Sequence, residues 1–272
     1  MTRIQVSIVG DHELLPALVK YYVETKKATV DQEIERDVYS EGEVDLAILG
    51  IGNQSLTRMV SEVEGLMKRS IPIIALVSSD IYPCAREIPN KSKHGMSPED
   101  DIVLKPGQTH PIKYLAAESL LLKHKYPIVI LRTFDVYGPE VQSTVAHWIS
   151  LAARKIPLPV IDDGEQKRTF LYIDDFLEAI DLLQVKLLEG ASGIYNIGAT
   201  EAISYKRLGY YVWSMLYGEE EGLSFNHLPS FETHTWKVPN IQKLQDFIPW
   251  APKVSLRRGL FNLLSHLQKS KA

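Results

Sequence analysis

Short apolar runs alternate with amphipathic segments along most of the sequence, and this alternation constrains the fold more than any other feature. The first pair is an apolar run at residues 4–9, then Gly10, then apolar residues from Leu14 to Tyr22 at the three-to-four-residue spacing of a helix. Parallel strands need a crossover connection, which is usually a helix, so strands that alternate with helices indicate a parallel sheet. We therefore predict an α/β fold with a doubly wound parallel sheet.

The same pattern predicts the remaining elements of the sheet. Further strands are expected at residues 44–49, 71–77, 127–131 and 193–197, and helices at 55–68, 111–124 and 174–188. The second strand should lie within residues 26–36, but this segment is highly charged and only Ala28, Val30 and Ile34 are apolar. We therefore expect the second strand to be short or frayed.

Two proline-rich segments fall outside the alternation. They are residues 140–173 and 200–272, and we predict that they form a small C-terminal, substrate-binding lobe over the carboxyl edge of the sheet, where such sheets bind ligands. Residues 1–139 would form the main Rossmann-type domain, to which residues 174–199 return.

Composition excludes several classes of function. The 272 residues carry a net charge of −4, which disfavours nucleic acid as a partner. Cys84 is the only cysteine and the histidines show no ligand spacing, so we expect no disulfide and no metal. The longest apolar run, residues 71–77, is far shorter than the ~20 residues of a membrane helix, and we recognise no targeting signal. These features predict a cytoplasmic protein without a membrane partner.

Three segments carry a specific resemblance. They are residues 130–139 (ILRTFDVYGP), 168–175 (RTFLYIDD) and 193–198 (GIYNIG). In this order and spacing they resemble the extended short-chain dehydrogenases, the NAD-dependent epimerase/dehydratase family, which modifies nucleotide-linked sugars. The resemblance covers nearly the whole chain, with a shortfall between Gly10 and Val44.

The resemblance implies a chemistry in which NAD takes a hydride from a sugar carbon. A Tyr, whose pKa is lowered by a Lys four residues later, takes the hydroxyl proton. Counting back from Glu118 places His110 at the Tyr position and Tyr114 at the Lys position. Lys113 is adjacent, but one residue turns a helical side chain by roughly 100°, so we expect it to point away from the site. The standard chemistry is therefore predicted to be lost or altered.

Two interpretations of His110 remain open. An imidazole with an ordinary pKa near 6.5 can accept a proton at neutral pH, so His110 would be a substitute general base; alternatively it is a helix residue without a catalytic role. Tyr114 is expected to pack rather than to act as a base, because an unassisted phenol has a pKa near 10. Ser78 matches the family's catalytic Ser/Thr and is either a ligand contact or a cap.

The family's cofactor loop has three glycines, of which the sequence keeps only Gly10. Glu13 and Pro16 occupy the other two positions. Two like charges about 4 Å apart repel by roughly 4 kcal/mol at an effective dielectric near 20, and a carboxylate competes with pyrophosphate for the same helix amides. NAD or NADP is thus implied by the resemblance and opposed by Glu13 and Pro16.

Two further glycines are expected at the cofactor. Gly50 and Gly52 follow the strand at 44–49 and are predicted, with Gly10, to bind it. The acid that ends the second strand in the family could be Asp31, Glu33 or Glu35.

The substrate side keeps more of the family pattern. Arg168 matches an arginine that contacts the nucleotide diphosphate in relatives, a role suited to a bidentate guanidinium. Asp135 stands where relatives often carry Asn, so an acceptor-only carboxylate replaces an amide. With Tyr137, these residues are predicted to bind a nucleotide-sugar or a similar small molecule.

The resemblance leaves two functions open. One is an epimerase/dehydratase-like enzyme with a non-standard active site, which we favour because the residues around Arg168 and Tyr137 match while the redox residues differ. The other is a catalytically inactive member that acts as a binding, regulatory or oligomer-partner subunit. The resemblance also implies a homodimer through the helices at 55–68 and 111–124.

Overall fold

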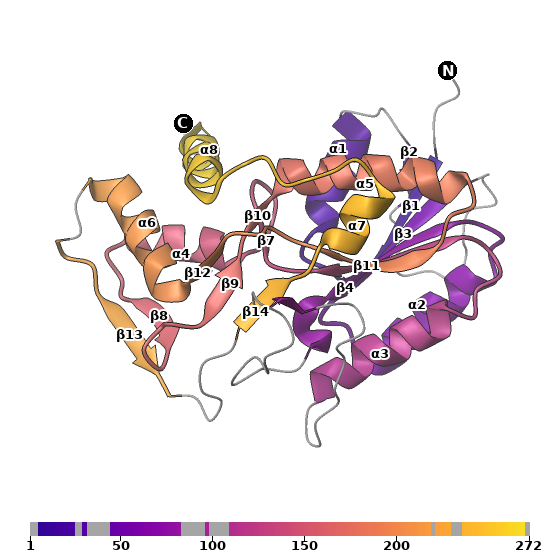
Figure 1. The fold of residues 1–272 in the computed structure, drawn as a ribbon, viewed down its shortest axis with the longest axis horizontal. Coiled ribbons are helices and arrows are strands. Elements are labelled where there is room, and N and C mark those ends of the chain that lie inside the picture. The colour runs from indigo at the N-terminus through magenta and orange to yellow at the C-terminus, as the bar shows by residue number, and fades with distance from the viewer. Residues whose placement is uncertain are drawn as a thin grey trace.

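The main feature of the fold is a six-stranded parallel sheet. The computed structural model describes residues 5–24, 29–31, 44–82, 96–97, 109–218, 221–229 and 236–269. The strand order is β11-β6-β4-β3-β1-β2, and every neighbouring pair is parallel (Figure 1). The strands are β1 (Gln5–Gly10), β2 (Thr29–Asp31), β3 (Leu46–Ile51), β4 (Ile73–Ser78), β6 (Ile128–Thr133) and β11 (Gly193–Ile197).

Helices cover both faces of this sheet. Helices α1 (Leu15–Glu24) and α5 (Ile173–Leu188) lie on one face, and α2 (Leu56–Met67) and α3 (Thr109–Leu121) lie on the other (Figure 1). This arrangement confirms the predicted α/β, doubly wound fold.

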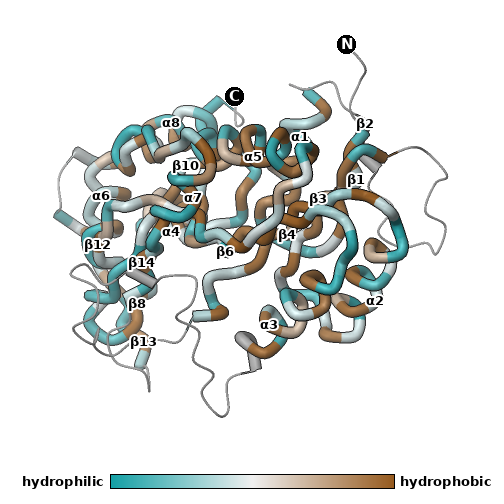
Figure 2. The backbone as a smooth tube through the Cα atoms, turned by 45° about the vertical axis from the view of Figure 1, so that its right-hand side comes forward, coloured by the Kyte–Doolittle hydropathy of each residue, from teal (hydrophilic) through white to brown (hydrophobic). Residues whose placement is uncertain are grey.

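The sheet strands are buried on both faces. In β3, Leu46 and Ile48 pack into the core beside α1 and α5, whereas Ala47 and Leu49 pack into the core beside α2 and α3. Figure 2 shows the same pattern as hydrophobic, brown tube at the centre of the molecule, around β4 and β6. Burial on both sides explains why these strands are continuous apolar runs in the sequence instead of alternating ones.

Most element boundaries lie within three residues of the predicted ones. Strand β2 has only three described residues, in agreement with the expected short strand, while residues 32–43, including Glu33 and Glu35, lie outside the described part. Helix α3 begins at Thr109, two residues before the predicted start at Pro111. Proline is tolerated there because the backbone N–H groups in the first turn of a helix have no acceptor within the helix. The N–H group that proline lacks therefore costs no helical hydrogen bond.

A smaller lobe lies beside the sheet. Its helices are α4 (Thr144–Ala153) and α6 (Tyr205–Tyr217), and its mixed sheet has the order β12-β9-β14-β5. These strands are β12 (Ala202–Ser204), β9 (Lys167–Thr169), β14 (Trp236–Pro239) and β5 (Met96–Ser97). Two strand pairs complete it: β8 (Leu158–Ile161) with β13 (Phe225–Leu228), and β7 (Val136–Tyr137) with β10 (Leu171–Tyr172).

The last two helices follow the lobe in the sequence. Helix α7 (Gln242–Phe247) contacts β11 of the main sheet, whereas the sequence predicts residues 200–272 in the lobe. Helix α8 (Leu256–Lys269) ends the described part of the chain. The predicted domain boundaries stay a prediction. Within the described ranges, no helix has the length and apolar character that crossing a membrane requires.

A buried ion pair joins α3 to the centre of the sheet. The guanidinium of Arg132 on β6 donates from Nε and Nη2 to the two carboxylate oxygens of Glu118, at 2.8 Å each, and both side chains are at most 5% exposed. Arg132 also donates to the Tyr82 hydroxyl at 3.0 Å, and that hydroxyl donates to Asn196 Oδ1 at 2.5 Å. A bidentate pair has a fixed geometry, so it sets the rotation of α3 against the sheet.

Removal of the cation from this pair is expected to destabilise the fold. Arg132→Met leaves the Glu118 carboxylate buried without a partner, so the free energy of unfolding should fall by roughly 3–5 kcal/mol in urea denaturation. Lys186→Met is the matched control, because the Lys186–Glu189 pair is exposed and should contribute less than about 1 kcal/mol. Equal effects of the two substitutions would contradict the prediction.

Candidate functional site

A cavity of about 500 Å³ lies where the carboxyl edge of the sheet meets the small lobe. Its walls come from the turn between β1 and α1, the loop after β3, the end of β4, helix α3 and the residues after β6. The lobe contributes Arg168, Tyr205 and Lys237. The carboxyl edge of a doubly wound sheet is the usual place for a ligand, so this cavity is the candidate site.

Glycines bring two loops into close contact at one end of the cavity. Gly10 has a φ of +107°, and a Cβ there would lie 2.0 Å from the carbonyl oxygen of Gly50. A Cβ on Gly52 would lie 1.7 Å from the carbonyl oxygen of Asp11. Gly52 lines the cavity, while Gly10 and Gly50 lie behind it. The close packing of the two loops explains why residues 10 and 52 are glycines. The contact of these glycines with a cofactor stays a prediction.

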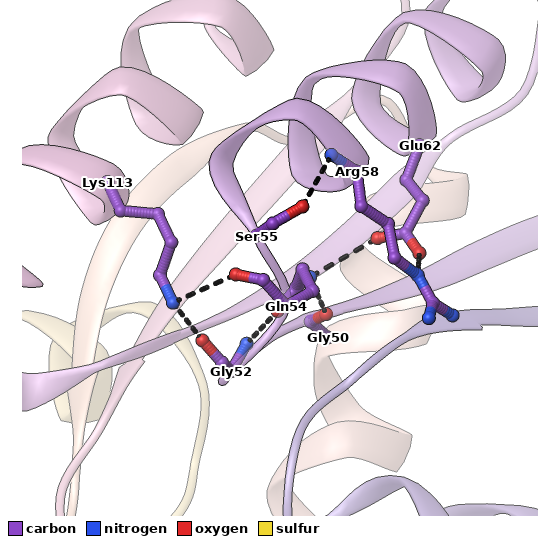
Figure 3. Close-up of polar contacts among 7 residues, drawn as sticks. All are labelled: Gly50, Gly52, Gln54, Ser55, Arg58, Glu62 and Lys113. Carbon is purple, nitrogen blue, oxygen red and sulfur yellow. Dashed lines mark hydrogen bonds and ion pairs between the residues drawn. The ribbon is translucent and has the colours of Figure 1, made fainter.

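Lys113 ties helix α3 to the loop after β3 (Figure 3). Its Nζ donates to the carbonyl oxygen of Gly52 and, at 3.4 Å, to that of Gln54. The Gln54 side chain in turn accepts from Gly52 N at 2.7 Å and donates to the Gly50 carbonyl at 3.1 Å. Lys113 therefore anchors a loop, and it is not among the residues that line the cavity.

Ser78 and Tyr114 come together in the cavity wall. Ser78 caps the short 3₁₀ helix η1 (Ser79–Ile81) by accepting from Asp80 N at 3.1 Å, and it also hydrogen-bonds the Tyr114 side chain. Burial raises the pKa of the Tyr114 phenol, and the Asp80 charge raises it further, although the Ser78 hydrogen bond opposes these effects. Tyr114 is thus a neutral hydrogen-bonding group at neutral pH. His110 lies in the first turn of α3, but its side chain is outside the described part.

The predicted substrate residues divide between the cavity and the core. Arg168 lines the cavity, its guanidinium lies 5.5 Å from the centre of the Tyr205 ring, and Asp135 lines the cavity as well. Burial raises the pKa of Asp135, while the charges of Arg168 and Lys237 oppose this rise. Tyr137, in contrast, is fully buried behind the cavity and donates to the carbonyl oxygen of Leu256 at 3.1 Å. In this structure Tyr137 holds the start of α8 in place.

Glu13 lies at the cavity rim, in the turn that precedes α1. The residue is exposed, yet protein atoms displace enough water from its carboxyl group to raise the pKa. Together with the charges of Asp135 and Asp80, this desolvation raises the pKa of Glu13 to about 7. Pro16 lines the same side of the cavity.

Sequence reasoning missed several cavity residues, among them His12, Asp80 and Lys237. His12 is buried, with Nε2 3.2 Å from the Thr133 hydroxyl, and burial lowers the pKa of His12 to about 4, so the ring is neutral. Its position two residues after Gly10 is a signal that could have found it. Lys237 and Asp80 form an ion pair across the cavity, but Lys237 lies in none of the three motifs. Within the described part of the chain, no cluster of His, Cys, Asp or Glu could hold a metal ion.

Comparison with known proteins identifies the family. Residues 53–198 match the model of the NAD dependent epimerase/dehydratase family. This chain belongs to that family.

Relatives in the family are similar over part of their length. UDP-glucuronic acid decarboxylase 2 of Arabidopsis thaliana is 32% identical over 136 residues, which is 48% of this chain and 29% of that protein. An uncharacterised UDP-glucose epimerase of Bacillus subtilis is 31% identical over 172 residues, 60% of this chain and 53% of that protein. The matched region thus spans less than two thirds of the length of these curated relatives.

Solved structures share the fold over the whole chain. MoeE5, in complex with UDP-glucose and NAD, has a TM-score of 0.81 at 17% identity and covers 98% of this chain and 100% of that one. UDP-glucuronic acid 4-epimerase from Bacillus cereus, in complex with UDP-glucuronic acid and NAD, has a TM-score of 0.79 at 18% identity, with coverage of 98% and 100%. At this identity the likeness shows the fold alone.

Glu13 should make stability depend on pH. Because its pKa is raised from 4.5 to about 7, the folded protein keeps a proton that the unfolded chain releases, so stability falls as pH rises through this interval. Glu13→Gln should therefore raise the melting temperature at about pH 8 and change it little near pH 4. Glu24→Gln, at the other end of α1, is the control. A Glu13→Gln effect of the same size at every pH would contradict the raised pKa.

Proposed function

We propose that this chain binds a nucleotide-sugar, or a similar phosphate-bearing small molecule, in the cavity, and that the family's NAD-dependent Tyr/Lys hydride chemistry is lost or altered. The observation that carries the proposal is the position of Arg168 in the cavity wall, stacked on Tyr205. The named substrates of the relatives, UDP-glucuronic acid and UDP-glucose, support the same ligand class.

Arg168 suits a diphosphate for a physical reason. A guanidinium presents several N–H donors in one plane and binds two phosphate oxygens at once. Stacking on Tyr205 restricts the side chain, so less entropy is lost when a ligand binds. Ser78 and Tyr114, on the opposite wall, offer hydroxyl groups to the sugar.

The turn after β1 fits the pyrophosphate of NAD poorly. Asp11 N donates to the Gly50 carbonyl, Leu14 N to His12 Nδ1, and Leu15 N to the His12 carbonyl, at 3.0, 3.3 and 3.0 Å. Pro16 has no N–H, and the Glu13 carboxyl group lies beside the same turn. A helix N-terminus binds phosphate through unpaired amides, and three amides of this turn, those of Asp11, Leu14 and Leu15, already have partners.

The cavity has the size of a ligand pocket. Pockets of roughly 300–1,000 Å³ enclose one drug-sized molecule, and this one measures about 500 Å³. A second cavity, of about 550 Å³, shares Gln142 and Tyr205 with it. Because His110 and Tyr114 stand at the family's Tyr and Lys positions, we derive no hydride step for this chain; Ser78, Tyr114 and Arg168 bind and orient the ligand, while His110 as a base stays a prediction.

The proposal predicts a selective response to ligands. UDP-glucose or UDP-glucuronic acid at micromolar concentration should raise the melting temperature, whereas NAD and NADP should not. Arg168→Met should weaken nucleotide-sugar binding roughly 10–100-fold in calorimetric titration, because charge-assisted hydrogen bonds to phosphate are lost. Arg154→Met is the control, since Arg154 is exposed at the end of α4.

Two outcomes would contradict this proposal. Stabilisation by NAD at the same concentration would show that the turn after β1 accepts a dinucleotide. Absence of any response to the nucleotide-sugars would reject the ligand class and would favour a structural or regulatory subunit.

We also propose that the chain forms a homodimer through α2 and α3. Exposed apolar side chains on or beside these helices, Leu56, Ile112 and Leu122, support such an interface. Light scattering should give twice the chain mass of 30.8 kDa, and Leu122→Lys should shift the mass to that of a monomer. Leu188→Lys, at an exposed site on α5, should leave it unchanged. A monomeric wild-type protein would contradict the interface.

A further inference from the structure

Two cations lie side by side on neighbouring strands of the small lobe. Arg168 on β9 and Lys237 on β14 are direct partners in the register of this parallel pair, and both line the cavity. Partner residues on adjacent strands project from the same face of a sheet, so the two positive charges lie close to one another. Like charges in this position repel each other unless an anion lies beside them.

The opposite side of the cavity supplies an anion for Lys237. Asp80 belongs to the short helix η1 after β4, and its carboxylate forms an ion pair with Lys237 Nζ across the cavity. Asp135 is a second carboxyl group near both cations: burial raises its pKa, and the charges of Arg168 and Lys237 oppose this rise. The two cations and these two carboxyl groups therefore balance when both carboxyl groups are ionised.

A phosphate group bound at Arg168 would disturb this balance. It would lie close to Lys237, so it would compete with Asp80 for the same ammonium group, and it would repel the Asp80 carboxylate. The exposure of the two partners decides which one moves. The Asp80 side chain is 50% exposed, whereas the Lys237 side chain is only 13% exposed. A half-exposed carboxylate can turn into water at little cost, but a largely buried ammonium group needs an anion beside it.

We propose that Asp80 holds Lys237 as a stand-in for phosphate, and that a phosphate-bearing ligand takes Lys237 from Asp80 when it binds beside Arg168. The inference rests on the proposed function and adds to it an internal contact that competes with the ligand. A phosphate ester has several acceptor oxygens and can use both cations, whereas a sugar without phosphate gains nothing from the exchange. The exchange also breaks a link between η1 and β14, so ligand binding loosens the contact between the sheet and the lobe at this point.

A double-mutant cycle on the ion pair tests the exchange. Calorimetric titration with UDP-glucose would compare the unmodified protein with Asp80→Asn, Lys237→Met and the double variant. Asp80→Asn should tighten binding roughly three- to tenfold because the competing carboxylate is gone, and Lys237→Met should weaken binding roughly tenfold. In the Lys237→Met background, Asp80→Asn should change the affinity by less than about twofold, since no ammonium group is left to release.

Two further variants complete the experiment. Asp80→Ser also removes the carboxylate and should show the same gain in affinity as Asp80→Asn. Glu178→Gln removes the carboxylate of another exposed ion pair, with Lys253, which does not line the cavity, and it should leave the affinity for UDP-glucose unchanged.

The outcomes separate the exchange from the function on which it rests. If UDP-glucose binds but Asp80→Asn and Asp80→Ser leave its affinity unchanged or lower it, the exchange is wrong and the proposed function stands. An equal gain from Asp80→Asn with and without Lys237 would assign the effect to general repulsion and would also overturn the exchange. Failure of UDP-glucose to bind to any of these proteins overturns both.

Discussion

The buried ion pair between Glu118 and Arg132 is the contact on which the arrangement of the cavity depends. It fixes helix α3 in rotation, since a guanidinium and a carboxylate that share two hydrogen bonds cannot turn relative to one another. Tyr114, one helical turn before Glu118, consequently faces Ser78 and the cavity. Lys113, one residue earlier, is directed to the carbonyl groups of the neighbouring loop.

The charged groups of the cavity are divided between the two parts of the molecule. In a doubly wound sheet the helix after the first strand normally supplies the unpaired amides for phosphate. Here three of the amides in that turn bond internally, to His12 and to the Gly50 carbonyl, and among the described residues the cations that line the cavity, Arg168 and Lys237, come from the lobe. The sheet side supplies carboxyl groups and hydroxyl groups, which suit the polar, non-phosphate part of a ligand.

Most of the fold could be predicted from the sequence, because strands buried on both faces leave continuous apolar runs that turns and helices interrupt. The motifs led to four residues that line the cavity, Ser78, Tyr114, Asp135 and Arg168, and the roles of these residues stay predictions. Tyr137 shares a motif with Asp135, but it is buried in the core, where its hydroxyl donates to the carbonyl oxygen of Leu256 on a segment far away in the sequence. Lys237 and Asp80 meet across 157 positions of sequence, and no local pattern could indicate that pair.

The contact between Lys113 and the loop after β3 bears on the energetics of any binding event. The loop is cross-linked to α3, to the turn after β1 and to itself through Gln54. A wall that is already ordered loses little conformational entropy when a ligand covers it, so preorganisation favours rigid-body association on this side of the cavity. On this side, discrimination among ligands then depends on the match of charges.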